Sequence, residues 1–369
     1  MPARGRPAGT GRERRGRYTG GVVLRSLSQL NVRNLRTPQV QLAAGVVALV
    51  GRNASGKSNL MDAAYLGCIG ELPAGTIAET VRIGENEGFV AAEVEHAEGV
   101  SRIEVGLAPG RKQLRLDGQA VRVVDIARTS TAVLITPGDA DLVHGTPSKR
   151  RGYVDALLSK LSPRYAALTR EYQRVLEQRN ALLRAGTGDA GLEVWTERFV
   201  ALGCEIDDVR RRAIRRVCEL AAVTYAEVAG DGKALRVTLR QNREACDLGE
   251  ALALARSEER ARGVTPVGPH RDDLGLELDG HSVQAYGSRG EARTVALALR
   301  VAEYRLLEEK HAEPPVLLVD DFTAELDAGR RAFLLDLTSR TPQALVSGTE
   351  PPPRADLTLH VDGGEVRRA

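Results

Sequence analysis

A glycine-rich motif that follows a short apolar run constrains the fold more than any other feature of this chain. Residues 46–50 (VVALV) have the length and β-branched content of a buried strand, and residues 60–66 have the composition of a helix. Between them, residues 51–58 (GRNASGKS) match the pattern G-x-x-x-x-G-K-[ST]. A strand, a glycine-rich loop and a helix in this order predict an α/β protein that holds phosphate groups at the loop.

Each position of this loop suits the binding of a nucleoside triphosphate. Its backbone N–H groups can turn inward as a nest for phosphate oxygens, and the N-terminus of the following helix adds to the positive field. We expect Lys57 to place its charge on the β- and γ-phosphates and Ser58 to ligate Mg²⁺. The predicted nucleotide-binding residues of the loop are Gly51, Arg52, Asn53, Ala54, Ser55, Gly56, Lys57, Ser58 and Asn59.

A second apolar strand ends in two carboxylates. Residues 316–319 (VLLV) are predicted to form a buried strand, and Asp320 and Asp321 follow directly. Consecutive strand residues point to opposite faces, but a turn at the strand end lets both side chains reach one edge. We expect Asp320 to hold Mg²⁺, directly or through water, and Asp321 to orient or deprotonate the attacking water. The alternative is an acidic turn without a catalytic role.

A helix start between these two motifs offers a further anion-binding point. Ser288, Gly290 and Glu291 open an apolar helix predicted over residues 291–309. The N–H groups at the start of a helix attract anions. The pattern alone is weak, because serine and glycine begin many helices. Its position shortly before the strand that carries Asp320 strengthens its interpretation as an anion-binding site.

Composition excludes several classes of protein. The chain has 369 residues, enough for two or three domains, of which 42% are hydrophobic and 27% charged. No apolar run approaches the ~18 residues of a membrane span, and no apolar segment of a secretory signal follows the basic N-terminus. The four cysteines lack metal-site spacing. We therefore expect a cytoplasmic protein with reduced thiols and no membrane partner.

Charge and periodicity divide the chain into parts. Residues 1–19 hold six Arg and one Glu with little apolar content, which predicts a disordered basic tail. Within residues 146–263, apolar residues recur at helical spacing in two runs that a glycine-rich break separates, as in an antiparallel helical hairpin. We expect this helical arm domain to be inserted into one α/β domain formed by residues 20–145 and 264–369, with β-hairpins at residues 89–125.

Several short segments in order along the chain carry a family resemblance. They are NVRNL (31–35), the loop at 51–59, PSKRR (147–151), QRNALL (178–183), VGPHRDD (267–273), SRGE (288–291), and LVDDF (318–322) with ELD (325–327). Together they resemble the ABC-type ATPase heads of the chromosome-maintenance and recombination-repair group, and within it the RecF family of bacterial recombination mediators. The resemblance covers about residues 22–350. It implies an α/β fold, the ABC-type P-loop ATPase head with a mixed or parallel sheet, from which the helical arm domain projects.

The resemblance implies two chains that sandwich two ATP molecules. Lys57 binds ATP in one chain, while Ser288 and Gly290 of the other chain contact its γ-phosphate, so that ATP and not ADP favours the dimer. Lys57, Asp321 and Ser288 are then catalytic residues, and Ser58 and Asp320 are the Mg²⁺ ligands. The implied dimer seam includes Arg289, Glu291 and Asp327.

The same resemblance implies an ATP-dependent DNA-binding protein of recombinational repair and replication restart. Such a protein binds duplex DNA or single-strand/duplex junctions and helps to load recombinase together with partners of the RecO and RecR type. It is a weak, DNA-dependent ATPase that uses hydrolysis as a switch, and it is cytoplasmic and associated with the nucleoid. The alternative is another ABC-type ATPase, either an SMC-like clamp or the nucleotide-binding subunit of a transporter, although such subunits lack the long arm.

The sequence departs from the usual pattern of these ATPases at four points. Asp321 stands where Glu is common, which predicts slow turnover. Residues 347–349 (SGT) occupy the place of a γ-phosphate-sensing His, and residues 136–139 (TPGD) that of the loop whose Gln contacts Mg²⁺. Ala54 stands where Gly is usual, which is harmless provided that its backbone φ is negative.

Basic side chains on the arm are the candidates for DNA contact. The tail and the arm each carry a net charge of +5 and the rest of the chain −7, so DNA has to meet a local basic surface. Aromatic residues make up only 4%, which favours contact with a duplex backbone over stacking on single strands. The alternative is a solvated helix face balanced by nearby acids. The candidates are Lys149, Arg150, Arg151, Arg211, Arg212 and Arg215, whereas His270 and Arg271 are expected to hold the joint between arm and head.

Overall fold

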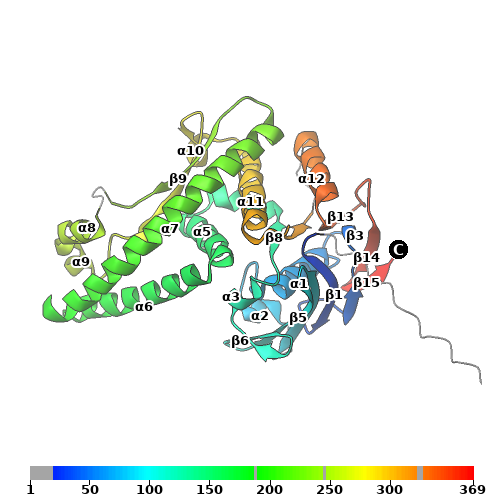
Figure 1. The fold of residues 1–369 in the computed structure, drawn as a ribbon, viewed down its shortest axis with the longest axis horizontal. Coiled ribbons are helices and arrows are strands. Elements are labelled where there is room, and N and C mark those ends of the chain that lie inside the picture. The colour runs from blue at the N-terminus through cyan, green and yellow to red at the C-terminus, as the bar shows by residue number, and fades with distance from the viewer. Residues whose placement is uncertain (1–19, 187–188, 244–246, 322–326) are drawn as a thin grey trace, which may run out of the picture.

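The computed structural model describes residues 20–186, 189–243, 247–321 and 327–369. The predicted tail at 1–19, Cys246 and residues 322–326 lie outside the described residues. None of the described helices combines the length and the hydropathy that crossing a membrane requires. Figure 1 shows two sheets gathered at one end of the molecule and long helices that project from them.

One six-stranded sheet carries the strands that precede both predicted site motifs. Its order is β15-β14-β3-β13-β12-β8, and all neighbouring pairs are parallel except β14 with β15. The strands predicted at 46–50 and 316–319 are confirmed as β3 and β12. Their carboxyl ends lie at one edge with only β13 between them, the edge where parallel α/β sheets bind ligands. The strands are β3 (Gly45–Val50), β8 (Ala132–Ile135), β12 (Val316–Val319), β13 (Gln343–Gly348), β14 (Leu357–Asp362) and β15 (Glu365–Arg368).

The second six-stranded sheet is antiparallel throughout, in the order β2-β1-β4-β5-β6-β7. It confirms β-hairpins within the expected range 89–125 as far as Ala120, since β4 pairs with β5 and β5 with β6 through short turns. The end of that range is instead helical, because helix α3 begins at Val123. Its strands are β1 (Val23–Leu30), β2 (Gln39–Gln41), β4 (Gly88–His96), β5 (Gly99–Ala108), β6 (Arg111–Leu116) and β7 (Gln119–Ala120).

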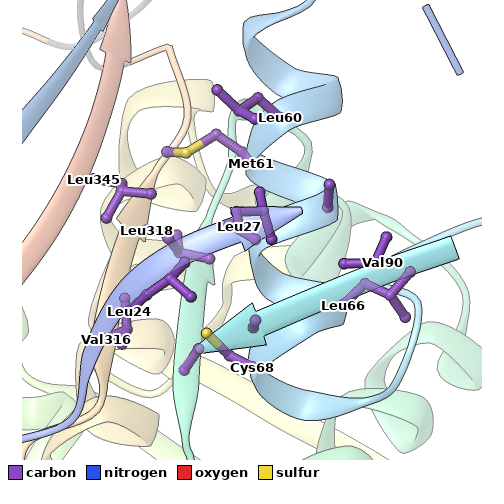
Figure 2. Packing of buried hydrophobic residues seen from close by; sticks show 14 of the residues in the cluster. Leu24, Leu27, Leu60, Met61, Leu66, Cys68, Val90, Val316, Leu318 and Leu345 are labelled. Carbon is purple, nitrogen blue, oxygen red and sulfur yellow. The ribbon is translucent and has the colours of Figure 1, made fainter. Parts of the chain in front are cut away.

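Helix α1 (Lys57–Ile69) fills the space between these two sheets. Its side chains Leu60, Met61 and Leu66 are buried in one cluster with Leu24 and Leu27 of β1 and with residues of β3, β12 and β13 (Figure 2). Burying each such side chain contributes roughly 1.5–3 kcal/mol. The helix that begins inside the glycine-rich motif is therefore fixed from both sides, which holds the loop in place.

Three helices form the arm and confirm the two predicted helical runs. They are α5 (Pro147–Leu161), α6 (Pro163–Ala185) and α7 (Asp189–Ala229). Gly186 ends α6 with a left-handed φ of 64°, and α7 returns alongside it (Figure 1). The 41 residues of α7 span about 60 Å at 1.5 Å per residue. Two short helices, α8 (Leu248–Leu254) and α9 (Arg256–Arg262), pack near the far end of this hairpin.

The core of the arm also includes residues that follow it in sequence. Apolar side chains of α11 (Arg289–His311), such as Val295 and Leu299, share a buried cluster with α5, α6 and α7. A three-stranded sheet, β9 (Leu235–Arg240), β10 (Asp273–Leu278) and β11 (His281–Ser282), joins the same cluster. The boundary at residue 263 stays a prediction. The remaining helices are α2 (Ile77–Thr80), α3 (Val123–Ile126), η1 (Pro137–Ala140), α4 (Asp141–His144), η2 (Pro269–Arg271), α10 (Val283–Tyr286) and α12 (Ala328–Arg340).

Candidate nucleotide-binding site

The glycine-rich loop has the backbone of a phosphate nest. Ala54 and Gly56 both have left-handed φ values, 63° and 112°, which is the geometry that turns successive N–H groups inward. Lys57 is 7% exposed, and its Nζ donates to Gly51 O at 2.8 Å and to Arg52 O at 2.9 Å. The ammonium group is therefore held against the loop by carbonyl groups that a bound phosphate can replace.

Both motif glycines are required by close neighbours from distant parts of the chain. A Cβ on Gly51 would lie 2.1 Å from Val361 O, a backbone atom of β14. A Cβ on Gly56 would lie 2.9 Å from Asn34 Oδ1, in the loop after β1. These two contacts show that the loop is enclosed by β14 on one side and by residues 31–36 on the other.

The condition under which Ala54 would be harmless, a negative φ, is not met. Its φ is +63°, so an L side chain stands in a left-handed backbone conformation that costs roughly 1–2 kcal/mol. The conformation persists because Gly56 is the N-cap of α1 and the buried face of α1 fixes the path of the chain after the loop. The chain therefore holds strain at the position where the usual sequence has glycine.

Replacing Ala54 by Gly is expected to raise the free energy of unfolding by about 0.5–1 kcal/mol. The gain from relieving a positive φ exceeds the loss from the greater freedom of glycine in the unfolded chain. Urea denaturation measures the difference. Ala312→Gly, at a φ of +54°, should behave alike, whereas Ala44→Gly, where φ is not positive, should lower stability. If Ala54→Gly is less stable than the parent, the backbone at residue 54 is not strained.

The donor set at the sheet edge fits Mg²⁺. Ser58 in the first turn of α1, just after β3 and the loop, is exposed. Asp320 follows β12, which lies two strands from β3, about 10 Å at the usual strand spacing. Hydroxyl, carboxylate and phosphate oxygens are the hard ligands that Mg²⁺ prefers, and it supplies charge neutralisation to a bound triphosphate. Among the described residues, no cluster of three or more His, Cys, Asp and Glu offers a separate metal site.

Ser347 links the carboxylate of Asp320 to the backbone of Asp321 at the end of β12. Its hydroxyl donates to Asp320 Oδ1 at 2.6 Å and accepts from the backbone N–H of Asp321 at 2.8 Å. Asp321 has a φ of +51°, so the chain turns there as expected, and both Asp320 and Asp321 line one cavity. The sequence indicated Ser347 only as one of the residues that stand in place of a γ-phosphate-sensing His. Its link between Asp320 and Asp321 depends on the pairing of β12 with β13, which no local pattern reveals.

The segment in place of the Mg²⁺-contacting Gln lies beside these carboxylates. Strand β8 pairs with β12 so that Ile135 is level with Val319, which puts Thr136 level with Asp320. The backbone N–H of Thr136 donates to Asp139 Oδ2 at 2.8 Å, and Asp139 Oδ1 accepts from Arg300 of α11. Thr136, Asp139, Arg293, Asp320, Asp321 and Leu334 line a shared pocket.

An arginine and a carboxylate outside the predicted set flank the start of α1. Arg33 Nη1 donates to Asn59 Oδ1 at 2.8 Å and to Asp62 Oδ2 at 2.6 Å. Burial raises the pKa of Asp62, which Arg33 opposes and the nearby charge of Asp320 reinforces. Asn34 accepts from Asn59 at 2.7 Å. The segment after β1, noted in the sequence only as a family match, is thus bound to the nucleotide loop.

Ser288 caps α11, and its side chain also hydrogen-bonds the carboxylate of Glu291. Its hydroxyl accepts from the backbone N–H of Glu291 at 3.2 Å, and Glu291 Oε2 accepts from the backbone N–H of Ser288 at 2.7 Å. Ser288 is exposed. Lys233 forms an ion pair with Glu291 and, with the bonds to Ser288, lowers the pKa of Glu291 to about 2. A fixed hydroxyl at a helix N-terminus is suited to an anion that approaches from outside.

The residues assigned to the dimer seam gather at two helix starts. Asp327 caps α12, and Arg330 Nη2 donates to Asp327 Oδ2 at 2.6 Å. The same Nη2 lies 3.5 Å from the position of a Cβ on Gly290, so Arg330 joins the start of α12 to the start of α11. In the described parts of the chain, no hydrogen bond links residues 288–291 to residues 51–59. The two half-sites are therefore separate within one chain.

Some of the side chains predicted to contact DNA are bound to other residues of the chain, and others are exposed. Arg150 is no longer a candidate for DNA contact. Arg150 is 5% exposed and binds both oxygens of Asp273, at 2.7 and 2.9 Å, so its guanidinium cannot reach a phosphate without breaking a buried pair. Arg151 is half-buried and donates to the carbonyl of Asp272 at 2.7 Å. Lys149 forms an ion pair with Asp141 at the surface.

The second group of candidates lies on α7. Arg211 pairs with Asp208 at 3.1 Å, while Arg212 and Arg215 are exposed one turn apart. No ion pair joins Arg212 or Arg215 to another residue that the structure describes. Arg216, next in the sequence, binds Glu309 of α11 instead. Arg212 and Arg215 thus remain the candidates on α7 with the least competition for a phosphate.

Both ring nitrogens of His270 are used in hydrogen bonds within the protein. Its Nε2 lies 3.0 Å from the carbonyl of Thr265, which can only accept, so Nε2 carries the proton and Nδ1 accepts from the hydroxyl of Tyr172 at 2.8 Å. Burial lowers the pKa of His270 to about 4, and the ring is neutral at physiological pH. The expected role of this residue at the joint between arm and head agrees with these contacts.

Comparison with known proteins places this fold and site in a family. The family described as RecF/RecN/SMC N terminal domain matches residues 23–351. Proteins named "DNA replication and repair protein RecF" are 48% identical in Deinococcus deserti, over 93% of this chain and 94% of the relative, and 47% identical in Deinococcus radiodurans, over 94% and 95%. The chain therefore belongs to the RecF/RecN/SMC family and, within it, to its RecF members.

Solved structures agree with this assignment. A structure of the recombination mediator protein RecF with ATP, in the RecFOR pathway, superposes with a TM-score of 0.89 at 26% identity and covers 96% of this chain and 99% of that one. The Smc head domain of Pyrococcus furiosus, at 17% identity and a TM-score of 0.53, covers 94% and 96% and shares the fold alone. The predicted ABC-type head fold and the resemblance to RecF are confirmed.

Proposed function

We propose that this chain is an ATP-dependent DNA-binding protein of recombinational repair and replication restart. It binds ATP with Mg²⁺ at residues 51–59, forms a homodimer in which Ser288 and Gly290 of one copy meet the γ-phosphate held by the other, and hydrolyses ATP slowly when DNA is bound. It acts on duplex DNA and junctions with partners of the RecO and RecR type, in the cytoplasm at the nucleoid. The names of its relatives and the ATP-bound neighbour support this proposal.

One observation carries the dimer. The nucleotide loop and the two carboxylates lie at one sheet edge, whereas Ser288, which caps α11, stands exposed at a different helix start. A helix start of this kind gains stabilisation only when an anion meets it. The γ-phosphate of a nucleotide on a second copy provides that anion, so ATP stabilises the pair and its hydrolysis releases it.

The DNA part of the proposal is tested on Arg212 and Arg215, two exposed arginines of α7 that no described ion pair holds. The double variant Arg212→Ala/Arg215→Ala is expected to lower affinity for duplex DNA about tenfold or more with ATP present. It should reduce the slope of log affinity against log salt by about 2, because each phosphate contact contributes about 0.9. Fluorescence anisotropy with a labelled duplex, over a salt series and with a non-hydrolysable ATP analogue, measures both quantities.

Arg216→Ala is the matched control for this pair. Its guanidinium is held by Glu309 and Glu219, so the salt slope should stay that of the parent. Sedimentation of the parent with the analogue and with ADP, in the absence and presence of the duplex, tests the dimer in the same samples. An unchanged salt slope in the double variant would remove α7 from the DNA surface, and a parent that stays monomeric with the analogue would refute the proposed function.

A further inference from the structure

The turn between β14 and β15 touches the nucleotide loop from outside. Strand β14 pairs in parallel with β3, with His360 level with Val50, so the β14–β15 turn emerges beside the point where the loop begins. There the backbone N–H of Gly364 donates to the carbonyl of Ser55 at 2.8 Å. This is a hydrogen bond between the loop and a segment that lies over 300 residues away in sequence.

The bond fixes the direction of one N–H group of the nest. The peptide unit between Ser55 and Gly56 is planar and trans, so its C=O and its N–H point in opposite directions. Because the Ser55 carbonyl points outward to Gly364, the N–H of Gly56 points the opposite way, toward the inside of the loop. Gly56 has a left-handed φ, which leaves this N–H unused by α1 and available to a phosphate oxygen.

Gly364 can make this bond only because it has no side chain. A Cβ there would lie 1.8 Å from Asn34 O and 2.7 Å from Asn34 C, both backbone atoms. The carbonyl of Gly364 in turn accepts from the N–H of Arg36 at 2.8 Å, and Val366 donates to Thr37 Oγ1 at 2.7 Å. The turn is thereby clamped between the loop and residues 34–37.

We propose that Gly364 is a positioning residue for nucleotide binding, which sets the orientation of the Ser55–Gly56 peptide so that the Gly56 N–H faces the phosphates. This inference rests on the proposed binding of ATP at residues 51–59 and adds a determinant that lies outside the motif. Gly364 does not itself touch the nucleotide; it acts through the loop.

Gly364→Ala tests the proposal. The new Cβ forces the turn away from Asn34, the bond to Ser55 is lost, and one N–H to a charged phosphate is no longer held in place. ADP and ATP should both bind about tenfold more weakly, the effect expected for one hydrogen bond to a charged group. Calorimetric titration measures the affinities, and hydrogen–deuterium exchange should show faster exchange across residues 51–58.

The neighbouring glycine provides the matched control. Gly363 also has a positive φ, +53°, but nothing lies within 4 Å of its Cβ position. Gly363→Ala therefore carries similar backbone strain without displacing the turn, and it should keep the affinity of the parent. This comparison separates positioning of the loop from general loss of stability, which thermal unfolding of both variants monitors.

If Gly364→Ala does not fold, Thr37→Val tests the same proposal. It removes the oxygen that accepts from Val366 and should weaken ADP and ATP binding by about threefold at a near-parent melting temperature. Folded variants at 364 or 37 that bind both nucleotides like the parent would overturn the role of the turn while leaving the proposed function intact. A parent that binds neither nucleotide would instead refute the proposed function.

Discussion

A protein that carries Ser288→Arg is expected to bind ATP as the parent does and to remain monomeric at every ATP concentration. Ser288 is exposed at the start of α11 and makes no described contact with the loop at 51–59, so the nucleotide site of its own chain is unaffected. The long cationic side chain fills the space that the γ-phosphate of a second copy must enter. Losing the cap costs about 1 kcal/mol, too little to unfold the protein. Sedimentation with a non-hydrolysable ATP analogue, alongside calorimetry, measures both properties.

Ser162→Arg is the control for the loss of a helix cap. Ser162 caps α6 and accepts from the backbone N–H of Tyr165 at 3.3 Å, so its replacement removes a similar bond far from the proposed seam. This variant should lose a similar amount of stability and still form the ATP-dependent dimer. If Ser288→Arg dimerises like the parent, the terminal phosphate is not held between two copies, and the mechanism proposed above is wrong.

The local parts of the site could be predicted from the sequence because each is encoded within a few consecutive residues. A strand of β-branched residues, a loop with two glycines and a lysine, and a helix are recognised together, and the strand that ends in Asp320 and Asp321 is recognised in the same way. The helical arm also followed from periodicity, since α6 and α7 keep one apolar face over many turns.

The contacts between distant segments could not be predicted in this way. Ser347 reaches Asp320 because β13 lies beside β12, and Gly364 reaches Ser55 because β14 lies beside β3. Strand order decides both contacts, and no short pattern encodes it. Arg150 shows the same limit for charge: in the sequence it belongs to a basic cluster, but in the fold it faces Asp273 on β10 and is buried.

The replacement of Arg179 by Met is expected to lower the free energy of unfolding by about 3–5 kcal/mol. Arg179 is 1% exposed, and its guanidinium donates to Glu259 of α9 at 2.7 Å and to Thr265 at 2.7 Å. It also donates to Thr196 of α7 and lies 5.7 Å from the ring centre of Phe199. One side chain thus joins α6, α7 and α9. Without it, Glu259, 2% exposed, is left as a buried charge that no longer has its partner.

A surface ion pair between α6 and α7 serves as the control that shows whether burial of the pair causes the loss of stability. Arg198 of α7 pairs with Glu171 of α6, and both side chains are about half exposed, so Arg198→Met should change the free energy of unfolding by less than about 1 kcal/mol. The double variant Arg179→Met/Glu259→Gln should recover much of the loss, because removing both charges leaves no unpaired ion in the arm. Urea denaturation followed by circular dichroism measures all three. If the double variant is as unstable as Arg179→Met, the loss comes from packing and from the bonds to Thr196 and Thr265, and the buried ion pair is not what holds the arm together.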